Sequence, residues 1–319
     1  MLATLDEQTR VFRDDVLAGL SAAIPAVPAR WLYDRRGSEL FDAITRLPSY
    51  YPTRTEIGIF RSKMVDIATH VPKGAAVVEF GAGSATKTPL LLEAISPAAY
   101  VPVDISGEYL NAGAEALQRR FPSLDVIPVV ADFARPFGLP GGIEHLPRLG
   151  FFPGSTIGNF VPWSATDLLR QFRALLGVGA QLLIGMDRVK PVDRLLAAYD
   201  DPEGVTAEFN LNLLTRINRE LEGNVPRDAF RHEARWNDML SRVEMHLVAT
   251  RDVQFSVAGR TFAFSAGSSI HTENSHKYDE RGGRLLLVAG GWTPVAEWTD
   301  PAGDFAVLLA VAEPERFAP

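Results

Sequence analysis

The sequence predicts an α/β protein built around a doubly wound, mostly parallel sheet. Short apolar runs, typical of buried strands, alternate with helical patterns between residues 57 and 187. The run at 76–80 stops at Gly81-Ala82-Gly83, after which a Leu-rich helix is expected at 89–95. Ligands of this fold bind beyond the carboxyl ends of the strands, where glycines allow close approach and helix starts offer N–H groups. We therefore expect the glycine turn to hold a ligand.

The other elements follow in chain order. A helix at 57–70 precedes the first strand, and further strands are expected at 99–104, 125–130, 149–153 and 181–187. Helices are expected between them, at 107–121 and 164–176. The pattern then becomes helical at 192–199 and 207–221, and strand-like at 242–251 and 261–264. Sheet character resumes at 284–289 and 305–312.

The simplest organisation has two parts. Residues 55–188 with 279–319 would form a nucleotide-binding-type core, and residues 1–54 with 189–278 would form a second, α+β lobe for the substrate. The N-terminal part opens with a helical pattern at 7–20 and does not resemble strands of the core. Its aromatic segments, 31–42 and 47–56, suit the lining of a pocket, although simple packing at the entry to the core also explains them.

The bulk composition narrows the class of protein. The 319 residues are 46% hydrophobic and 22% charged, which is ordinary for a globular enzyme with a sizeable core. A net charge of −7 without a Lys/Arg block argues against nucleic acid or an anionic membrane as partner. The lack of cysteine excludes disulfides, thiolate metal sites and a cysteine nucleophile. No signal peptide or membrane span is evident, so we expect a cytoplasmic protein. We also expect a monomer, although no sequence feature determines the oligomeric state.

Residues at three successive strand ends indicate the ligand of the glycine turn. Asp104 ends the second strand, 23 positions after Gly81, and can accept from a ribose diol. The glycine turn and Asp104 are compatible with either NAD or S-adenosylmethionine as the ligand. Thr86 in place of a third glycine, the pair Asp132-Phe133 for an adenine ring, and Lys87 for a small carboxylate favour S-adenosylmethionine. Each residue alone has a structural explanation, as a helix cap, a solvated lysine or a strand end.

A metal centre is not expected. The six histidines show no His-x-x-x-His spacing, and Glu273-x-x-His276 lies in a segment that does not read as a helix. His271 and His276 are interpreted as loop or strand residues without metal. No Gly-x-Ser-x-Gly elbow or phosphate-binding loop is present, so hydrolase and kinase chemistry have no support.

Six short motifs resemble a specific family. They lie at residues 33–41, 44–56, 154–159, 198–201, 204–210 and 272–275. Together they resemble the L-histidine Nα-methyltransferase family of ergothioneine biosynthesis, over nearly the whole chain. The resemblance implies a class I, Rossmann-like methyltransferase core. It also implies transfer of three methyl groups from S-adenosylmethionine to the α-amine of histidine, which gives hercynine.

The resemblance also implies roles for particular residues. Those matching the donor site are Gly81, Lys87, Asp104, Asp132 and Phe133; those matching the histidine site are Tyr50, Asn159, Tyr199, Glu273, Asn274 and Ser275. Tyr33 matches a tyrosine near the amine. Glu273 can accept from the imidazole N–H while Ser275 serves the other nitrogen. A phenol with a pKa of about 10 is a poor base at neutral pH, so we expect Tyr33 to orient the amine.

Two small departures from the family pattern, Ala131 before Asp132 and Ser49 in place of an acid, touch no expected contact. Three other functions remain open at this point. They are methylation of another amino acid such as tryptophan, S-adenosylmethionine binding without catalysis, and a nicotinamide dehydrogenase.

Overall fold

A computed structural model describes residues 7–83 and 86–314, so Ser84 and Ala85 of the glycine turn and the first six residues lie outside the described part. The chain folds as two compact units. Unit 1 comprises Met1–Tyr50 and Pro191–Asn274, and unit 2 comprises Tyr51–Lys190 and Ser275–Pro319. The assignment of substrate binding to the first of these stays a prediction.

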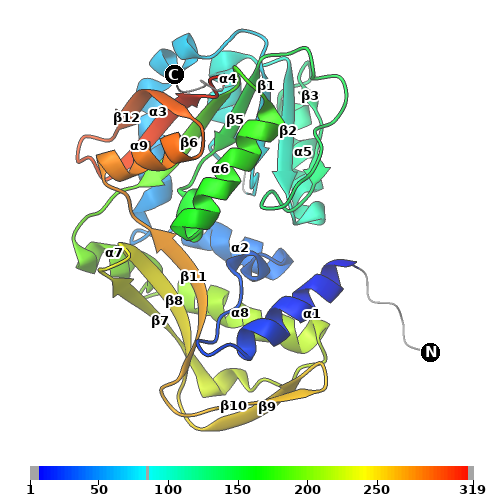
Figure 1. Cartoon of the computed structure of the whole chain (residues 1–319), viewed down its shortest axis with the longest axis vertical. Helices are drawn as coiled ribbons and strands as arrows, with labels where there is room; N and C mark the ends of the chain where they lie inside the picture. The colour runs from blue at the N-terminus through cyan, green and yellow to red at the C-terminus, as the bar shows by residue number, and fades with distance from the viewer. Residues whose placement is uncertain (1–6, 84–85, 315–319) are drawn as a thin grey trace, which may run out of the picture. The chain divides into compact units, whose positions relative to one another are not determined.

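Unit 2 is built on one twisted sheet with the order β12-β13-β6-β5-β1-β2-β3, in which β4 also pairs with β2 (Figure 1). The strands are β1 (Ala76–Phe80), β2 (Ala99–Asp104), β3 (Asp125–Val126), β4 (Val129–Val130), β5 (Arg148–Phe152), β6 (Gln181–Asp187), β12 (Thr293–Thr299) and β13 (Phe305–Val311). The strands from β3 to β6 are parallel, and β13 is antiparallel to β6 and to β12. The strand order reverses between β1 and β5, as in doubly wound folds. This confirms the expected class I methyltransferase core.

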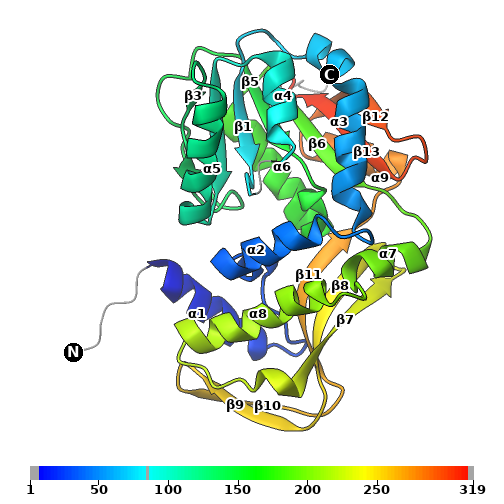
Figure 2. The same cartoon turned by 180° about the vertical axis from the view of Figure 1, so that it is seen from behind.

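Helices cover both faces of this sheet. Figure 1 shows α6 (Pro162–Leu176) and α9 (Glu280–Ala289) on one face, and Figure 2 shows α3 (Tyr51–His70), α4 (Thr88–Ile95) and α5 (Gly107–Arg120) on the other. Alternate strand residues supply the two cores. Val77 packs in the core under α3, whereas its neighbour Val78 packs in the core under α6. Burial on both faces explains why these strands are near-continuous apolar runs.

Residues 284–289, expected as a strand, lie in helix α9, so this prediction was wrong. The Asp279 carboxylate accepts from the N–H of Gly282 at 2.5 Å, which caps the helix start. Leu287 is fully buried, while Leu285 and Val288 are more than half exposed. The apolar run is therefore one side of a helix plus exposed residues, and its length alone resembled a buried strand.

Two other elements differ from the sequence-based expectation by more than a shift of one or two residues at an end. The strand expected at 125–130 is divided into β3 and β4, because Pro128 between them has no N–H for the ladder. Helix α3 begins at Tyr51 rather than at residue 57. Pro52 is compatible with that earlier start, since proline is tolerated in the first helical turn.

Unit 1 combines an antiparallel sheet with helices. Its sheet has the order β11-β8-β7, with β7 at Phe230–Asn237, β8 at Arg242–Ala249 and β11 at Ser269–His276. The remaining elements are the hairpin β9 (Val253–Val257) and β10 (Arg260–Phe264), the 3₁₀ helices η1 (Ala29–Leu32) and η3 (Arg227–Ala229), and helices α1 (Glu7–Leu20), α2 (Arg35–Ile44), α7 (Val192–Tyr199) and α8 (Val205–Glu220). Strands β7, β9 and β11 were not predicted from the sequence.

The chain passes between the units three times, and residues beside all three crossings bond to one carboxylate of unit 2. The Asp187 carboxylate is fully buried. It accepts from the Tyr51 hydroxyl at 2.7 Å, from Lys190 Nζ at 2.6 Å and from Lys277 Nζ at 2.7 Å. Burial raises the pKa of Asp187, but the two ammonium groups outweigh it and hold that pKa below its ordinary value. The backbones also meet here, where Arg188 pairs with Tyr278.

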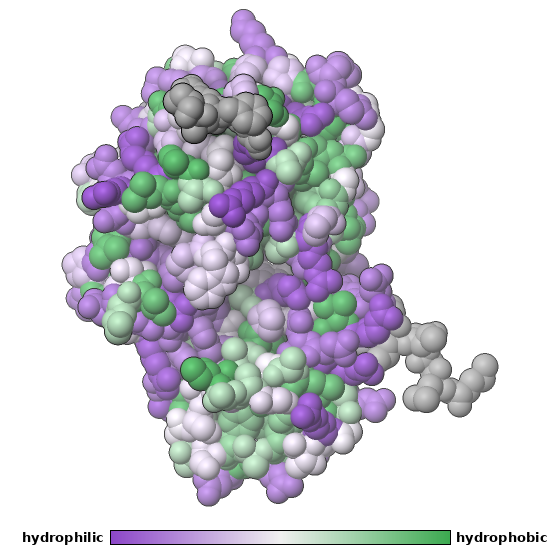
Figure 3. Space-filling view, viewed as in Figure 1, coloured by the Kyte–Doolittle hydropathy of each residue, from purple (hydrophilic) through white to green (hydrophobic). Residues whose placement is uncertain are grey.

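The exposed surface is chemically mixed. On the face drawn in Figure 3, hydrophilic and hydrophobic residues are interspersed. Within residues 7–83 and 86–314, none of the helices has the length and apolar character required to cross a bilayer.

Candidate functional site

The glycine turn of unit 2 is tied to the end of strand β2. Gly81 has a φ of +76°, which favours glycine, and its N–H donates to the Val103 carbonyl at 2.8 Å. A Cβ at this position would lie 3.3 Å from Cε1 of Phe133. Gly81, Asp104 and Phe133 therefore gather at the carboxyl ends of β1, β2 and β4, where ligands of this fold bind.

Asp104 carries a carboxylate at the edge of this site. Its Oδ1 accepts from the backbone N–H of Ser106 at 2.9 Å, which closes a turn just before helix α5. Ser106 is the N-cap residue of that helix, so Asp104 is not its cap. Burial raises the pKa of Asp104, and backbone N–H groups, including that of Gly83 in the glycine turn, oppose the rise without cancelling it. The carboxylate is thus held by backbone next to the turn.

Asp132 and Phe133 follow strand β4. The Asp132 carboxylate accepts from the N–H of Ala134 at 3.0 Å and lies 3.6 Å from Arg135 Nε. The Phe133 ring packs edge-on against Phe152, with ring centroids 5.6 Å apart. The contact with Phe152 helps to fix the Phe133 ring, whose Cε1 lies beside Gly81.

Lys87 is paired with an acid that sequence reasoning had missed. Its Nζ lies 2.5 Å from Oε2 of Glu56, whose side chain is fully buried. The same carboxylate accepts from the backbone N–H of Gly154, at 2.9 Å and 3.1 Å from its two oxygens. Glu56 is the last residue of the 44–56 motif, which was the only sequence signal for it. Lys87 therefore links the glycine-turn helix to helix α3.

A second group of predicted residues in unit 2 surrounds the end of strand β11. A Cβ at Gly158 would lie 2.8 Å from the carbonyl oxygen of His276, so only glycine permits this backbone approach. The approach brings Asn159, the next residue, near the strand end that carries Ser275. Ser275 is buried, and its Oγ lies 2.7 Å from Nζ of Lys277.

Unit 1 gathers the predicted tyrosines in an aromatic cluster. Its members are Tyr33, Phe41, Tyr50, Tyr199 and Phe209. Tyr50 and Tyr199 have ring centroids 6.0 Å apart, and Tyr33 packs edge-on against Phe209 at 5.3 Å. Phe41 and Phe209 were not assigned a role from the sequence, although both belong to quoted motifs.

The Tyr33 hydroxyl donates to Oε1 of Glu273 at 3.2 Å. Burial, and then the negative charge of Glu273, raise the pKa of Tyr33 well above its ordinary value. The phenol is therefore protonated throughout the neutral range. This hydrogen bond connects Tyr33, which is expected near the substrate amine, with Glu273, which is expected at the imidazole.

The backbone carbonyl of Tyr199 accepts a hydrogen bond from a buried histidine, His232, which was not identified from the sequence. His232 Nε2 lies 2.8 Å from the Tyr199 carbonyl oxygen. A carbonyl can only accept, so Nε2 carries the proton, and the Asn210 amide donates to Nδ1 at 2.9 Å. Burial lowers the pKa of His232, which keeps the ring neutral. Asn210 is the last residue of the 204–210 motif, and it is connected to the Tyr199 backbone through His232.

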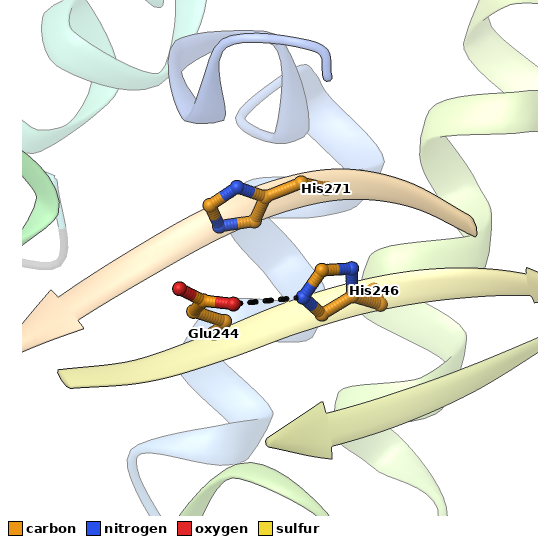
Figure 4. Close-up of side chains that lie close together, drawn as sticks. All are labelled: Glu244, His246 and His271. Carbon is orange, nitrogen blue, oxygen red and sulfur yellow. Dashed lines mark hydrogen bonds and ion pairs between the residues drawn. The ribbon is translucent and has the colours of Figure 1, made fainter. Parts of the chain in front are cut away.

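Glu244, His246 and His271 form a cluster that could be considered for a metal ion (Figure 4). Their ligand atoms lie within 4.8 Å of one another. The Glu244 carboxylate is already held by the Arg242 guanidinium at 2.6 Å, and hydrogen bonds from neighbouring side chains help to lower its pKa to about 2 despite burial. The two imidazole rings are stacked, 16° from parallel, so their in-plane lone pairs do not converge. The cluster fits a hydrogen-bonded group beside a cation better than a metal site.

Strand alternation separates the last three predicted residues. Glu273 and Ser275 are two positions apart in β11 and project to the same side, whereas Asn274 between them projects to the other. The Asn274 side chain hydrogen-bonds His271. A direct contact of Asn274 with a substrate stays a prediction.

Comparison with known proteins gives a consistent set of relatives. Residues 12–312 match the family model described as histidine-specific methyltransferase, SAM-dependent. The chain is 41% identical over 305 residues to a histidine N-alpha-methyltransferase of Mycobacterium tuberculosis, covering 93% of this chain and 94% of the relative. A histidine N-alpha-methyltransferase of Mycolicibacterium smegmatis is 40% identical over 314 residues, covering 96% of each chain. A 4-dimethylallyltryptophan N-methyltransferase of Aspergillus fumigatus is 26% identical, covering 92% and 91%.

Proposed function

Because the chain belongs to the histidine-specific, S-adenosylmethionine-dependent methyltransferase family, we propose that it methylates the α-amine of L-histidine. Three methyl groups pass from S-adenosylmethionine to this nitrogen and give hercynine, in ergothioneine biosynthesis. The observation that carries this function is the identity of about 40%, over nearly the full length of both chains, to two histidine N-alpha-methyltransferases.

The donor is assigned to the carboxyl edge of the unit 2 sheet. Gly81 leaves room for close approach of the donor, and Asp104 accepts from the ribose hydroxyls. Asp132 and Phe133 receive the adenine ring, and Lys87 offers an N–H to the methionine carboxylate while it remains paired with Glu56. The residues fit this donor, since a carboxylate, an aromatic face and a cation stand at neighbouring strand ends. The donor supplies an electrophilic methyl group on a sulfonium.

The histidine is assigned to Tyr50, Tyr199, Glu273 and Asn274 of unit 1, and to Asn159 and Ser275 of unit 2. Glu273 accepts from the imidazole N–H, and Ser275 serves the other ring nitrogen. Tyr199 and Asn159 hold the carboxylate or the amine by neutral hydrogen bonds. These roles are supported by the burial of Glu273 and Ser275 and by the aromatic cluster around Tyr50 and Tyr199.

Tyr33 orients the amine and does not deprotonate it. Its raised pKa keeps the phenol protonated, which makes it a donor to Glu273 and a poor base at neutral pH. The proton of the amine goes to solvent or to the substrate carboxylate. We expect kcat/KM to rise with pH as the amine loses its proton, and a profile that is flat from roughly pH 6 to 10 contradicts the claim that the amine must be deprotonated before it reacts.

One assay tests the reaction. The full chain, S-adenosylmethionine and histidine are incubated together, and mass spectrometry counts one, two or three added methyl groups. Tryptophan is the alternative substrate considered from the sequence, and one relative is a 4-dimethylallyltryptophan N-methyltransferase, so tryptophan is assayed beside histidine. If S-adenosylhomocysteine raises the melting temperature but no amino acid is methylated, the chain is a donor-binding protein and the proposed reaction is wrong.

The finer expectations on partners and location follow from composition. The net charge of −7 and the absence of a basic block support a small-molecule enzyme that binds neither nucleic acid nor membrane. We infer that it acts as a cytoplasmic monomer. Light scattering at working concentration and fractionation of cells that produce it test these two points.

A further inference from the structure

One side of helix α8 holds the segment that carries Tyr33. Four α8 residues, spaced three, four and three positions apart, lie along this side: Phe209, Asn212, Arg216 and Arg219. The Phe209 ring packs against the ring of Tyr33, and Arg216 Nη1 donates to the Trp31 carbonyl at 3.0 Å. The other two bind the carboxylate of Asp34, a residue to which the roles above give no part. All of these residues belong to unit 1.

The Asp34 carboxylate is held by donors on both of its oxygens, and its side chain is only 8% exposed. Oδ1 accepts from the backbone N–H of Gly37 and from Nδ2 of Asn212, both at 2.8 Å, and Oδ2 accepts from Nη2 of Arg219 at 2.7 Å. Burial raises the pKa of Asp34, but these donors, with the nearby charge of Arg216, outweigh it and hold that pKa below its ordinary value. An ionised carboxylate can only accept, so each of these bonds has a fixed direction.

The chain on the other side of Tyr33 is held just as closely. A Cβ at Gly37 would lie 1.8 Å from the Leu32 carbonyl oxygen, so only glycine permits this approach. Tyr33 therefore lies between two residues whose positions are fixed, Leu32 and Asp34. The bond from its hydroxyl to Glu273, at 3.2 Å, is already longer than the ~2.5–3.0 Å usual for an O–H donor. A displacement of about half an ångström is then enough to break it.

We propose that Asp34 is a positioning residue, because its bonds to helix α8 hold Tyr33 at the place where it reaches Glu273. The proposal rests on the proposed function, in which Tyr33 orients the substrate amine. The simpler explanation is that Asp34 only caps helix α2, which starts at the next residue. A cap requires only the bond from Gly37, however, and the two bonds from α8 have no part in it. They connect the residue that follows Tyr33 to the helix on which the Tyr33 ring packs.

Asp279→Ala is the matched control for Asp34→Ala. Both aspartates are N-cap residues, of α9 and α2, and both carboxylates accept from the N–H of a glycine three positions on. Each variant loses one helix cap, so both should lower the urea midpoint of unfolding. Only Asp34→Ala also loses the bonds to α8, and we expect it to lower kcat/KM for histidine about tenfold. Asp279→Ala should leave kcat/KM unchanged, and an equally unchanged value in Asp34→Ala overturns the proposal.

A second background shows whether Asp34 acts through Tyr33. In Tyr33→Phe the hydroxyl is already absent, so Asp34→Ala should lower kcat/KM by less than about twofold there. The same tenfold loss in both backgrounds overturns the proposal, since it indicates a general effect on the fold. If Asp34→Ala does not fold, Asn212→Ala replaces it, because it leaves the cap of α2 in place and alanine favours the helix. We expect about a threefold loss of kcat/KM in Asn212→Ala, and an unchanged value overturns the proposal.

A fluorine NMR measurement separates failure of this proposal from failure of the proposed function. The full chain is labelled with 3-fluorotyrosine, and the signal of Tyr33 among those of the 7 tyrosines is the one missing from Tyr33→Phe. Asp34→Ala and Asn212→Ala should shift this signal, whereas Asp279→Ala should not. A signal at the wild-type position in both of the first two variants overturns the proposal, whatever the activity. If the signal shifts as expected but the wild type does not methylate histidine, the proposed function is refuted and the positioning of Tyr33 by Asp34 stands.

Discussion

Glu79, in the strand before the glycine turn, should make the stability of the protein depend on pH. Its carboxylate is buried and accepts from the Tyr100 hydroxyl at 2.7 Å and from the Thr88 hydroxyl at 2.8 Å. Burial raises the pKa of Glu79 from 4.5 to about 7, although these hydrogen bonds lower it in part. The folded state therefore binds the Glu79 proton more tightly than the unfolded chain does.

The sign and size of the effect follow from linkage. Below pH 4.5 both states are protonated and Glu79 contributes no pH dependence. As pH rises from about 4.5 to 7, the unfolded chain ionises first, so the free energy of unfolding falls. One unit of pKa difference between the folded and unfolded states corresponds to 1.36 kcal/mol. A rise of about 2.5 therefore lowers the free energy of unfolding by about 3 kcal/mol, and this loss is complete above pH 7.

The assay compares wild type with Glu79→Gln by urea unfolding between pH 4 and 8.5, followed by fluorescence and circular dichroism. The glutamine cannot ionise, so the stability of the variant relative to wild type should increase by about 3 kcal/mol across this range. Glu115→Gln, at an exposed carboxylate, serves as the control and should show no such increase. A constant difference between Glu79→Gln and wild type at all pH values refutes the reasoning.

Three further substitutions test the assigned site. Tyr33→Phe removes the hydrogen bond to Glu273, and we expect kcat/KM to fall about tenfold at every pH; a changed profile shape would instead indicate a proton-transfer role. Glu273→Ala should weaken histidine binding in calorimetry by about 1–3 kcal/mol, with donor binding unchanged, and equal histidine affinity counts against the assignment. Lys87→Met leaves Glu56 buried without its cation and should cost about 3 kcal/mol of stability or more in urea unfolding. Adding Glu56→Gln should restore most of that loss, and absence of rescue argues against the ion pair as its cause.

The sheet of unit 2 could be predicted because its central strands have a clear sequence pattern. Strands β1, β2 and β6 are buried on both faces, so they read as continuous apolar runs that end at glycine or aspartate. Strand β12 at the sheet edge and the charged strand β7 are only partly buried, and their mixed composition hid them. The apolar run of α9 was misread because run length does not distinguish a short strand from a helix side.

For the candidate site, the motifs indicated residues but not their partners. Glu56 and Lys87 are 31 positions apart, and Lys277 lies 90 positions after Asp187. Nothing in the spacing of such charges shows which of them pair once the chain folds. His232 was missed for the same reason, since the carbonyl it contacts belongs to a helix 33 positions earlier.

The backbone pairing of Arg188 with Tyr278 has a consequence for how this protein could have arisen. The N–H of Val189 also donates to the Tyr278 carbonyl, at 3.3 Å, so the chain leaves unit 2 and returns to it at one place. A segment whose ends meet can be added to an existing domain, or removed from it, without reordering the strands around it. Residues 191–274 thus have the architecture of a domain insertion. Residues 191–274 can therefore vary in evolution while the strand order of unit 2 is retained, whereas Tyr33, Tyr50, Asn159 and Ser275 of the proposed acceptor site lie outside this segment.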